Sequence, residues 1–235
     1  MKIAIDGPSG AGKSTVAKQL AKKLTMTYID TGAMYRAVAV AVIALGIPTD
    51  DAEAVKAELN NIEVSIGHDG VTGEQIVYLN GADVTPLIRT PQVSSGASDV
   101  SRIPDVKLKM VEQQRLIAKD CDVIMDGRDI GTFVFPDAEK KYYLTASAGE
   151  RARRRYLELR AKGARASYDE CLSELLRRDE NDSSRSLAPL AVADDAIILE
   201  TDNMTAPEVT RFLLHDIRRH SSAANQDACS ISSFI

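Results

Sequence analysis

The sequence lacks a long apolar stretch. Its longest apolar run, from Ala37 to Leu45, covers nine of the 235 residues, well short of the roughly 20 that a membrane-spanning helix needs. Asp6 interrupts the apolar residues at the amino terminus, which argues against a secretory signal peptide. These two absences predict a protein that does not enter a membrane and that resides in the cytoplasm.

Cysteine is scarce, and positive charge is not in excess. The three cysteines, Cys121, Cys171 and Cys229, have no metal-type spacing and leave one without a partner, so we expect free thiols, as a reducing compartment allows. The formal net charge of −5 argues against nucleic acid as a partner, because that needs a basic surface to displace counterions from the phosphates. Any affinity for phosphate must therefore be local.

The residues that are present are typical of a globular protein. Hydrophobic residues make up 44% and charged residues 27% of the chain, as in soluble domains. The length suits one domain of ordinary size or one with sizeable insertions. We therefore predict a single domain over residues 1–220.

A glycine-rich segment lies between a short apolar strand and an amphipathic helix at the amino terminus. Its two glycines five residues apart, followed by lysine and a hydroxyl residue, match the P-loop pattern, whose backbone N–H groups converge on a phosphate. We expect Lys13 to reach the β- and γ-phosphates of a nucleoside triphosphate, and Ser14 to complete a Mg²⁺ shell supplied largely by water and phosphate. The predicted phosphate-binding residues are Gly7, Pro8, Ser9, Gly10, Ala11, Gly12, Lys13, Ser14 and Thr15.

Short apolar runs, mostly separated by helical patterns, predict an α/β fold with three α/β/α layers and a parallel five-stranded sheet. Ligands bind beyond the carboxyl ends of such strands, so Asp6, Asp30 and Asp126, which end three runs, should meet at one edge. An acid placed like Asp126 can position Mg²⁺ or its waters. The runs are Ile3–Ile5, Tyr28–Ile29, Val123–Met125, Tyr142–Leu144 and Ile197–Leu199.

Two stretches break this alternation. Residues Ile62 to Asn80 contain two strand-like runs around a glycine-punctuated connection, which predicts an antiparallel insert at about 60–98. Two capping boxes, Ser147 to Glu150 and Ser167 to Glu170, predict two helices separated by a C-cap at Gly163. We call this predicted helical hairpin, about 147–185, the lid.

The carboxyl-terminal part of the chain begins with a third capping box, Thr205 to Glu208. It predicts a last helix that runs to about Arg219. Residues 221–235 show neither a helical nor a strand period, so we predict a flexible tail there.

The segment DTGAMYR predicts a second anion site. Asp30 ends a strand, and the guanidinium of Arg36 follows one helical step after the turn, where it can fork onto a monophosphate. Thr31 and Tyr35 are placed to line the same pocket. In the alternative interpretation, Tyr35 belongs to the core and Arg36 is exposed.

The segment VIMDGRDIGT carries three charged residues to the end of an apolar strand. Behind Asp126, Arg128 can hold a phosphoryl oxygen, and Asp129 can accept a hydrogen bond from a base or a ribose. The alternative is an ion pair that fixes a tight turn.

Basic residues are concentrated in the predicted lid. Residues 151–165 contain seven basic residues and a single acid, Glu158. Closing such a lid over a transferring phosphoryl group would offset the charge that develops there. The alternative is a solvated, salt-bridged helical pair. Arg151, Arg154 and Arg155 share one helical face, and Arg178, Asp182 and Arg185 point the same way from the end of the second helix.

A P-loop is compatible with a GTPase switch, a motor ATPase or a small-molecule kinase. The chain contains no Asn-Lys-x-Asp motif for reading guanine. The second anion pocket and the arginine-rich lid within one short chain favour the kinase.

Four segments, in this order and separation, resemble the bacterial cytidylate kinases: IAIDGPSGAGKST, DTGAMYR, DGRDIGT and RDENDSSRSLAPL. The resemblance extends from about Lys2 to Arg219 and implies that ATP phosphorylates CMP or dCMP, with the insert in the monophosphate-binding region. It further implies that Arg36, Arg128 and Arg185 hold the acceptor phosphate, that Arg178 and Asp182 hold the sugar, and that Ser98 and Asp129 read cytosine.

One position departs from the family pattern. Lys107 stands where many of these kinases carry an arginine that helps to read the base, and lysine cannot reproduce a planar fork. Cytosine offers an amine donor where uracil has an acceptor, so the oxygens of Ser98 and Asp129 favour cytosine. Two alternatives remain open: a kinase of this fold for another acceptor such as UMP, and a regulator that binds a nucleotide without turnover. We expect a monomer.

Overall fold

The computed structural model describes the backbone of residues 1–231 and the side chains of residues 1–219. A five-stranded sheet lies at its centre in the order β2-β6-β1-β7-β8, and every neighbouring pair is parallel. The predicted strands and the predicted fold class are confirmed, and each strand is slightly longer than predicted. The strands are β1 (Lys2–Asp6), β2 (Thr27–Asp30), β6 (Val123–Asp126), β7 (Lys140–Thr145) and β8 (Ile197–Glu200).

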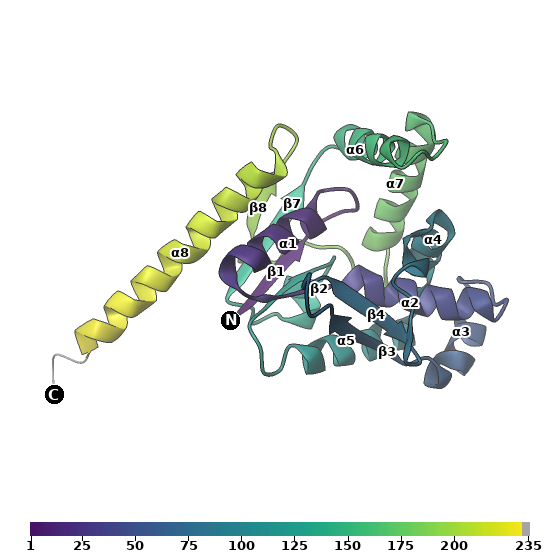
Figure 1. Cartoon of the computed structure of the whole chain (residues 1–235), viewed down its shortest axis with the longest axis horizontal. Helices are drawn as coiled ribbons and strands as arrows, with labels where there is room; N and C mark the ends of the chain where they lie inside the picture. The colour runs from purple at the N-terminus through teal and green to yellow at the C-terminus, as the bar shows by residue number, and fades with distance from the viewer. Residues whose placement is uncertain (232–235) are drawn as a thin grey trace.

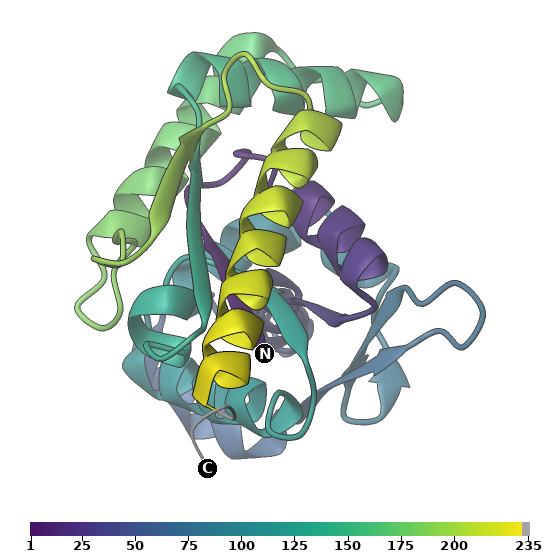
Figure 2. The same ribbon diagram turned by 90° about the vertical axis from the view of Figure 1, so that its left-hand side faces the viewer.

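Helices cover both faces of this sheet (Figures 1 and 2). Ile3 and Ile5 of β1 pack in one cluster with α1 (Lys13–Leu24) and α8 (Ala206–Ile231). Ala4, which points the opposite way, packs in another cluster with α5 (Pro104–Ile117) and the short π-turn η3 (Ile130–Val134). The alternation along a central strand buried on both sides therefore produces the three layers.

The insert follows α2 (Thr31–Ala44), whose buried residues share a core cluster with it. Its antiparallel strands β3 (Val64–His68) and β4 (Gln75–Leu79) are confirmed. A third strand, β5 (Ala82–Asp83), was not predicted, because a run of two residues shows no alternation of apolar and polar side chains. The other elements here are α3 (Ala52–Glu58), η1 (Leu59–Asn61), η2 (Leu87–Arg89) and α4 (Pro91–Val100).

The lid is the predicted pair of helices, α6 (Ala148–Ala161) and α7 (Tyr168–Ser183). The capping box of Ser167 and Glu170 is complete. Gly163 has a φ of +75°, and the Ala164 N–H donates to the carbonyl of Leu159 at 3.0 Å, as in a Schellman C-cap. The turn that reverses the chain in the lid is therefore encoded locally.

Only one of the two hydrogen bonds of the capping box predicted at Ser147 forms, so this prediction is wrong in its second half. The Ser147 hydroxyl does accept from the Glu150 N–H at 3.3 Å. The Ser147 N–H, however, donates to the carboxylate of Asp202 at 3.0 Å, and the Glu150 carboxylate accepts from Arg153 and Arg154 instead. Asp202, which is distant in sequence, thus accepts the Ser147 N–H that the Glu150 side chain accepts in a complete capping box.

The last helix is longer than predicted. It begins near the third predicted capping box, of which one half forms: Glu208 accepts from the Thr205 N–H at 2.8 Å, and the Thr205 hydroxyl donates to the same carboxylate at 2.7 Å. The helix continues to Ile231 instead of ending near Arg219. Residues 221–231 contain neither proline nor glycine, so nothing in them ends a helix that has already been nucleated. The predicted tail, residues 221–235, is thus helical as far as Ile231, and residues 232–235 lie outside the described residues.

The composition raised the questions of membrane crossing and of the state of the cysteines. Among the described residues, none of the helices combines the length and the apolarity that a membrane crossing requires. Cys121 and Cys171 are free thiols, whereas the side chain of Cys229 lies outside the described residues.

Candidate active site

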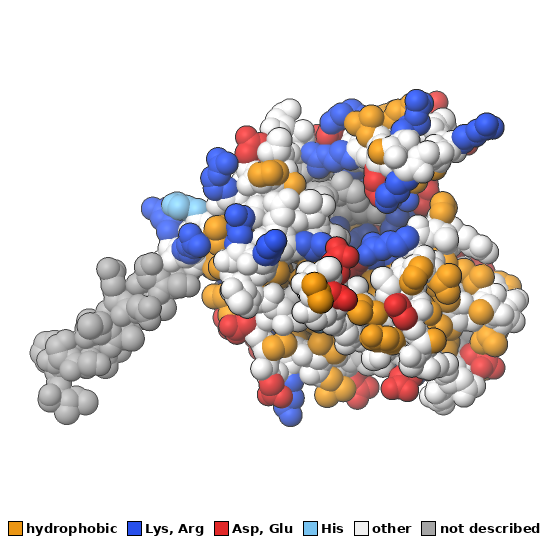
Figure 3. Space-filling view, viewed as in Figure 1, with side chains coloured by type: hydrophobic (Ala, Val, Ile, Leu, Met, Phe, Trp, Pro, Cys, Tyr) orange, Lys and Arg blue, Asp and Glu red, His pale blue; other side chains and the backbone are white. Residues whose placement is uncertain are grey.

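A cavity of about 920 Å³ opens between the lid, α4 and the carboxyl edge of the sheet. Figure 3 shows lysine and arginine side chains around the hollow below the lid. Asp30 and Asp126 end neighbouring strands in direct register and line the cavity, as predicted. Asp6, the third predicted acid, ends β1 but does not line the cavity, and its carboxylate accepts from the Ile130 and Gly131 N–H groups. Most predicted site residues line this cavity: Ser9, Gly10, Gly12, Lys13, Ser14, Thr15, Thr31, Tyr35, Arg36, Ser98, Lys107, Asp126, Arg128, Asp129, Arg154, Arg155, Arg178, Asp182 and Arg185.

Four predicted site residues lie outside the cavity wall. Gly7 has a φ of +141°, and a Cβ there would lie 2.0 Å from the carbonyl oxygen of Leu144, so only glycine allows the loop to pass β7 this closely. Ala11 packs in the core against α8, and Pro8 presents its carbonyl to Lys13. Arg151, the fourth, is described with the lid below.

Lys13 is buried at the base of the P-loop. Its ammonium donates to the carbonyl of Pro8 at 2.7 Å. Burial, reinforced by the positive charge of Arg128, lowers the pKa of Lys13 to about 7. A bound anion would reverse this effect, because it stabilises the protonated amine.

Asp126 lies at the centre of the cavity floor. Its carboxylate accepts hydrogen bonds from the Ser14 hydroxyl at 2.8 Å and from the Tyr28 hydroxyl at 2.7 Å. Thr31 donates to the backbone carbonyl of Asp126 at 2.8 Å. Burial, together with the negative charge of Asp30, raises the pKa of Asp126. A nearby cation would therefore stabilise this carboxylate.

The oxygen atoms of Ser14 and Asp126 are of the type that Mg²⁺ prefers. Within the described part of the chain, no group of three or more His, Cys, Asp or Glu side chains is arranged to hold a metal ion.

Arg36 and Arg89 meet at the carboxylate of Asp30. Arg36 donates to Asp30 at 2.7 Å, and Arg89 of η2 approaches the same oxygen at 3.7 Å. Burial opposes ionisation of Asp30, but these two guanidinium groups hold its pKa below the usual value. Two cations share one carboxylate, so the group retains a net positive charge toward the cavity.

A second cationic group joins the β6 edge to the lid. Arg128 donates to Asp182 at 2.6 Å, and Arg185 contacts the same carboxylate while donating to the Ser101 hydroxyl at 2.8 Å. The buried Nε of Arg178 has no partner among the described residues. Burial and the proximity of Arg128 lower the pKa of Arg178 to about 10. Three arginines against one acid favour an anionic ligand.

The predicted base-reading residues lie deeper in the cavity. Lys107 and Asp129 form a buried ion pair, in which the ammonium lies 2.7 and 2.6 Å from the two carboxylate oxygens. The ammonium also lies 5.3 Å from the centre of the Tyr35 ring. Ser98 on α4 is buried and accepts from Asn181 of α7 at 3.3 Å. Asp129 is therefore already paired with Lys107, whose ammonium is a compact charge and cannot form the planar, two-pronged contact of an arginine.

The three lid arginines have different surroundings. Arg154 and Arg155 line the cavity, where Arg154 bonds to Thr201 and Arg155 pairs with Glu158 at 2.9 Å. Arg151 is buried and donates to the carbonyl of Ser9 at 3.0 Å and to Asp179 at 2.7 Å. Arg151 therefore joins the P-loop to both lid helices.

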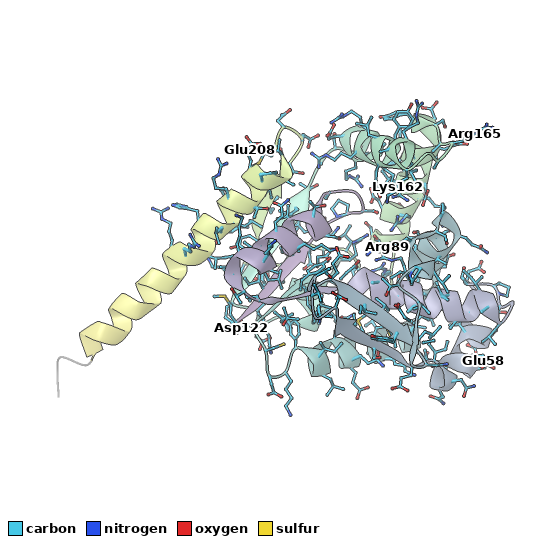
Figure 4. All side chains as sticks on the ribbon, in the orientation of Figure 1. Glu58, Arg89, Asp122, Lys162, Arg165 and Glu208 are labelled. Carbon is cyan, nitrogen blue, oxygen red and sulfur yellow. The ribbon has the colours of Figure 1, made fainter. Side chains whose placement is uncertain are left out.

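Sequence reasoning missed several residues of the cavity wall. Arg89 and Lys162 lie on opposite sides of it, one on η2 and one after α6 (Figure 4). Ser101, which binds Arg185, was also missed. Lys162 belongs to the basic run of the lid but was not singled out within it, whereas Arg89 and Ser101 lie in no recognisable motif. Only the folding of the insert and the lid brings these residues to the site.

A comparison with known families agrees with this geometry. The family model described as cytidylate kinase matches residues 3–219. A cytidylate kinase of Caldicellulosiruptor saccharolyticus is 52% identical over 91% of this chain and 94% of its own, and one of Carboxydothermus hydrogenoformans is 51% identical over 93% and 98%. A solved shikimate kinase of Bacteroides thetaiotaomicron aligns with 93% of this chain and 98% of its own at 15% identity and a TM-score of 0.47. The match over nearly the whole length, together with the P-loop and the two cationic groups, means that the chain belongs to the cytidylate kinase family.

Proposed function

We propose that this protein transfers the γ-phosphoryl group of ATP to CMP or dCMP, which yields ADP and CDP or dCDP. The observation that carries the proposal is the joining of a P-loop and a separate set of arginines in one cavity. A single bound nucleotide would not need both the P-loop and the separate arginines. Two nucleotides bound with their phosphates facing each other would use both sets of residues.

The donor side of the site is the P-loop. Lys13 and the backbone around Gly10 and Gly12 would hold the phosphates of ATP, and α1 directs the positive end of its dipole at them. A second cavity of about 460 Å³ opens beside the P-loop and shares Gly12, Thr15 and Arg154 with the main one. It is the proposed place for the adenosine of the donor.

Ser14 and Asp126 would hold Mg²⁺ together with phosphate oxygens and water. The ion would shield the negative charge of the donor phosphates. The buried Asp126 carboxylate supports this assignment, because its raised pKa indicates a group that gains from a nearby cation.

The acceptor side is the rest of the cavity. Arg36, Arg128 and Arg185 would bind the phosphate of the monophosphate, with Thr31 beside it. Arg178 and Asp182 would bind the sugar. Ser98, Asp129, Lys107 and Tyr35 would surround the base. The phosphate and sugar roles are supported by the excess of buried or half-buried guanidinium groups over carboxylates at this place.

The chemistry needs little covalent work from the protein. The acceptor phosphate is already a competent nucleophile, so the residues only have to hold it in line with the donor and neutralise charge. Closure of the insert, about 60–98, and of the lid, about 147–185, would bring Arg154 and Arg155 over the transferring group. Closure would also exclude water and so suppress hydrolysis of ATP. We propose a monomer as the acting unit and the cytoplasm as its location.

One assay tests this function directly. ADP release is measured with ATP and each of CMP, dCMP, UMP and AMP. We expect turnover with CMP or dCMP, and a loss of several orders of magnitude in Lys13→Ala but not in Lys22→Ala, which changes an exposed lysine on the same helix. Equal ADP release without any monophosphate would refute the proposal, and a preference for UMP would refute the roles of Ser98 and Asp129.

A further inference from the structure

The hairpin of the insert is attached to the edge of the central sheet through side chains. Strand β2 is an edge strand of that sheet. Gln75 and His68 face each other across β3 and β4, and both reach β2. His68 bonds to the carbonyl of Tyr28 at 3.0 Å. Gln75 accepts from the Asp30 N–H at 2.8 Å and donates to the Asp30 carbonyl at 3.3 Å.

Gln75 thus pairs with Asp30 as a neighbouring strand would. Its carboxamide has one acceptor and one donor in a plane, which match the N–H and C=O of a single residue. Two hydrogen bonds to one residue fix its orientation more strictly than one bond can. Because β2 ends at Asp30, this contact lies at the point where the strand meets the cavity.

The Asp30 side chain organises part of the cavity. Its carboxylate accepts from the Ala33 N–H at 3.0 Å, which caps α2. The same carboxylate holds Arg36 at 2.7 Å and lies 3.7 Å from Arg89. Arg36 and Arg89 line the cavity, but Gln75 does not. A shift of the Asp30 backbone would therefore move both guanidinium groups.

We propose that Gln75 is a positioning residue for the acceptor phosphate. Gln75 fixes Asp30, and Asp30 fixes Arg36 and Arg89 in the direction of the cavity. This inference rests on the proposed function, because it requires that the acceptor phosphate binds at Arg36. Because Arg89 shares the Asp30 carboxylate with Arg36, the same inference places Arg89 at the acceptor-phosphate site.

Gln75→Ala is the variant that tests this role. We expect the KM for CMP to rise about three- to tenfold, the effect of losing about one net hydrogen bond, while the KM for ATP and kcat change less than about twofold. A direct measurement of CMP binding in the absence of ATP should show the same loss. A merely structural role would affect both substrates alike.

Two further variants serve as controls. Asp69→Ala removes the hydrogen bonds from Val71 and Thr72 that shape the hairpin tip, without a contact to β2, and should leave the KM for CMP unchanged. His68→Ala loosens the hairpin beside Asp30 and should have a smaller effect than Gln75→Ala.

Two results overturn the inference alone: an unchanged KM for CMP in Gln75→Ala, or equal changes in Gln75→Ala and Asp69→Ala. A wild-type protein that is inactive on CMP refutes the proposed function and, with it, this inference.

Discussion

The unusual environment of Lys13 predicts that ATP binding takes up a proton. In the free protein its pKa is about 7, lowered by burial and by Arg128. At pH 8 about nine-tenths of these amines are neutral, and a bound polyanion returns them to the charged form. The charged fraction falls from about one half at pH 7 to about 1% at pH 9, so the apparent Kd for ATP should rise about 50-fold over this range.

Calorimetric titration at pH 8 measures this uptake. ATP is titrated into the protein in two buffers that differ in ionisation enthalpy, and the difference in heat gives the protons bound. We expect about 0.9 proton per ATP. The terminal phosphate of ATP contributes little, because phosphate monoesters have a pKa of about 6.

Lys13→Met is the matched variant. It should bind ATP more weakly at pH 7, and its Kd should vary little between pH 7 and pH 9. If the wild-type protein takes up no proton at pH 8 and keeps the same Kd at both values, Lys13 is charged in the free protein and the reasoning is wrong.

Two buried charges predict effects on stability. Burial raises the pKa of Asp6 to about 6 despite hydrogen bonds from Ile130 and Gly131. The protonated Asp6 therefore contributes its full stability to the folded state below about pH 4. This contribution, about 3 kcal/mol, is lost as the pH rises through 6. Denaturant unfolding from pH 4 to 7 should show this slope in the wild type but not in Asp6→Asn; parallel slopes would contradict it. Lys107→Met should cost about 3–5 kcal/mol in unfolding free energy, because it leaves Asp129 buried without a partner, and Lys107→Met/Asp129→Asn should recover at least half. An equal loss in both variants would show that the pair is not the cause.

The features predicted correctly from the sequence depend on residues that are close together in it. The P-loop requires only glycines at the close approaches and the Lys13 amine at its end, so one short segment contains all the information. The box at Ser167 and the C-cap at Gly163 are equally local. The apolar runs predicted β1, β2 and β6 because strands buried on both faces leave little room for polar side chains. Strand β8, whose residues alternate between half-buried and exposed, was predicted from its apolar residues alone.

Tertiary structure decided the pairings between distant groups. The local pattern at Ser147 resembles that at Ser167, yet Asp202 takes the place of the capping glutamate. Arg151 shares a helical face with Arg154 in the sequence, but the packing of the lid against the P-loop buries it at Ser9. No spacing rule predicts these outcomes.

The same division holds for the electrostatics of the site. The residue types alone indicate an anion-binding site. Which acid holds which cation depends on the docking of the insert and the lid, as with Asp30 and Arg89 or Asp182 and Arg128. A pKa shift such as that of Lys13 arises from burial and from charges on other elements, and both exist only after the chain has folded.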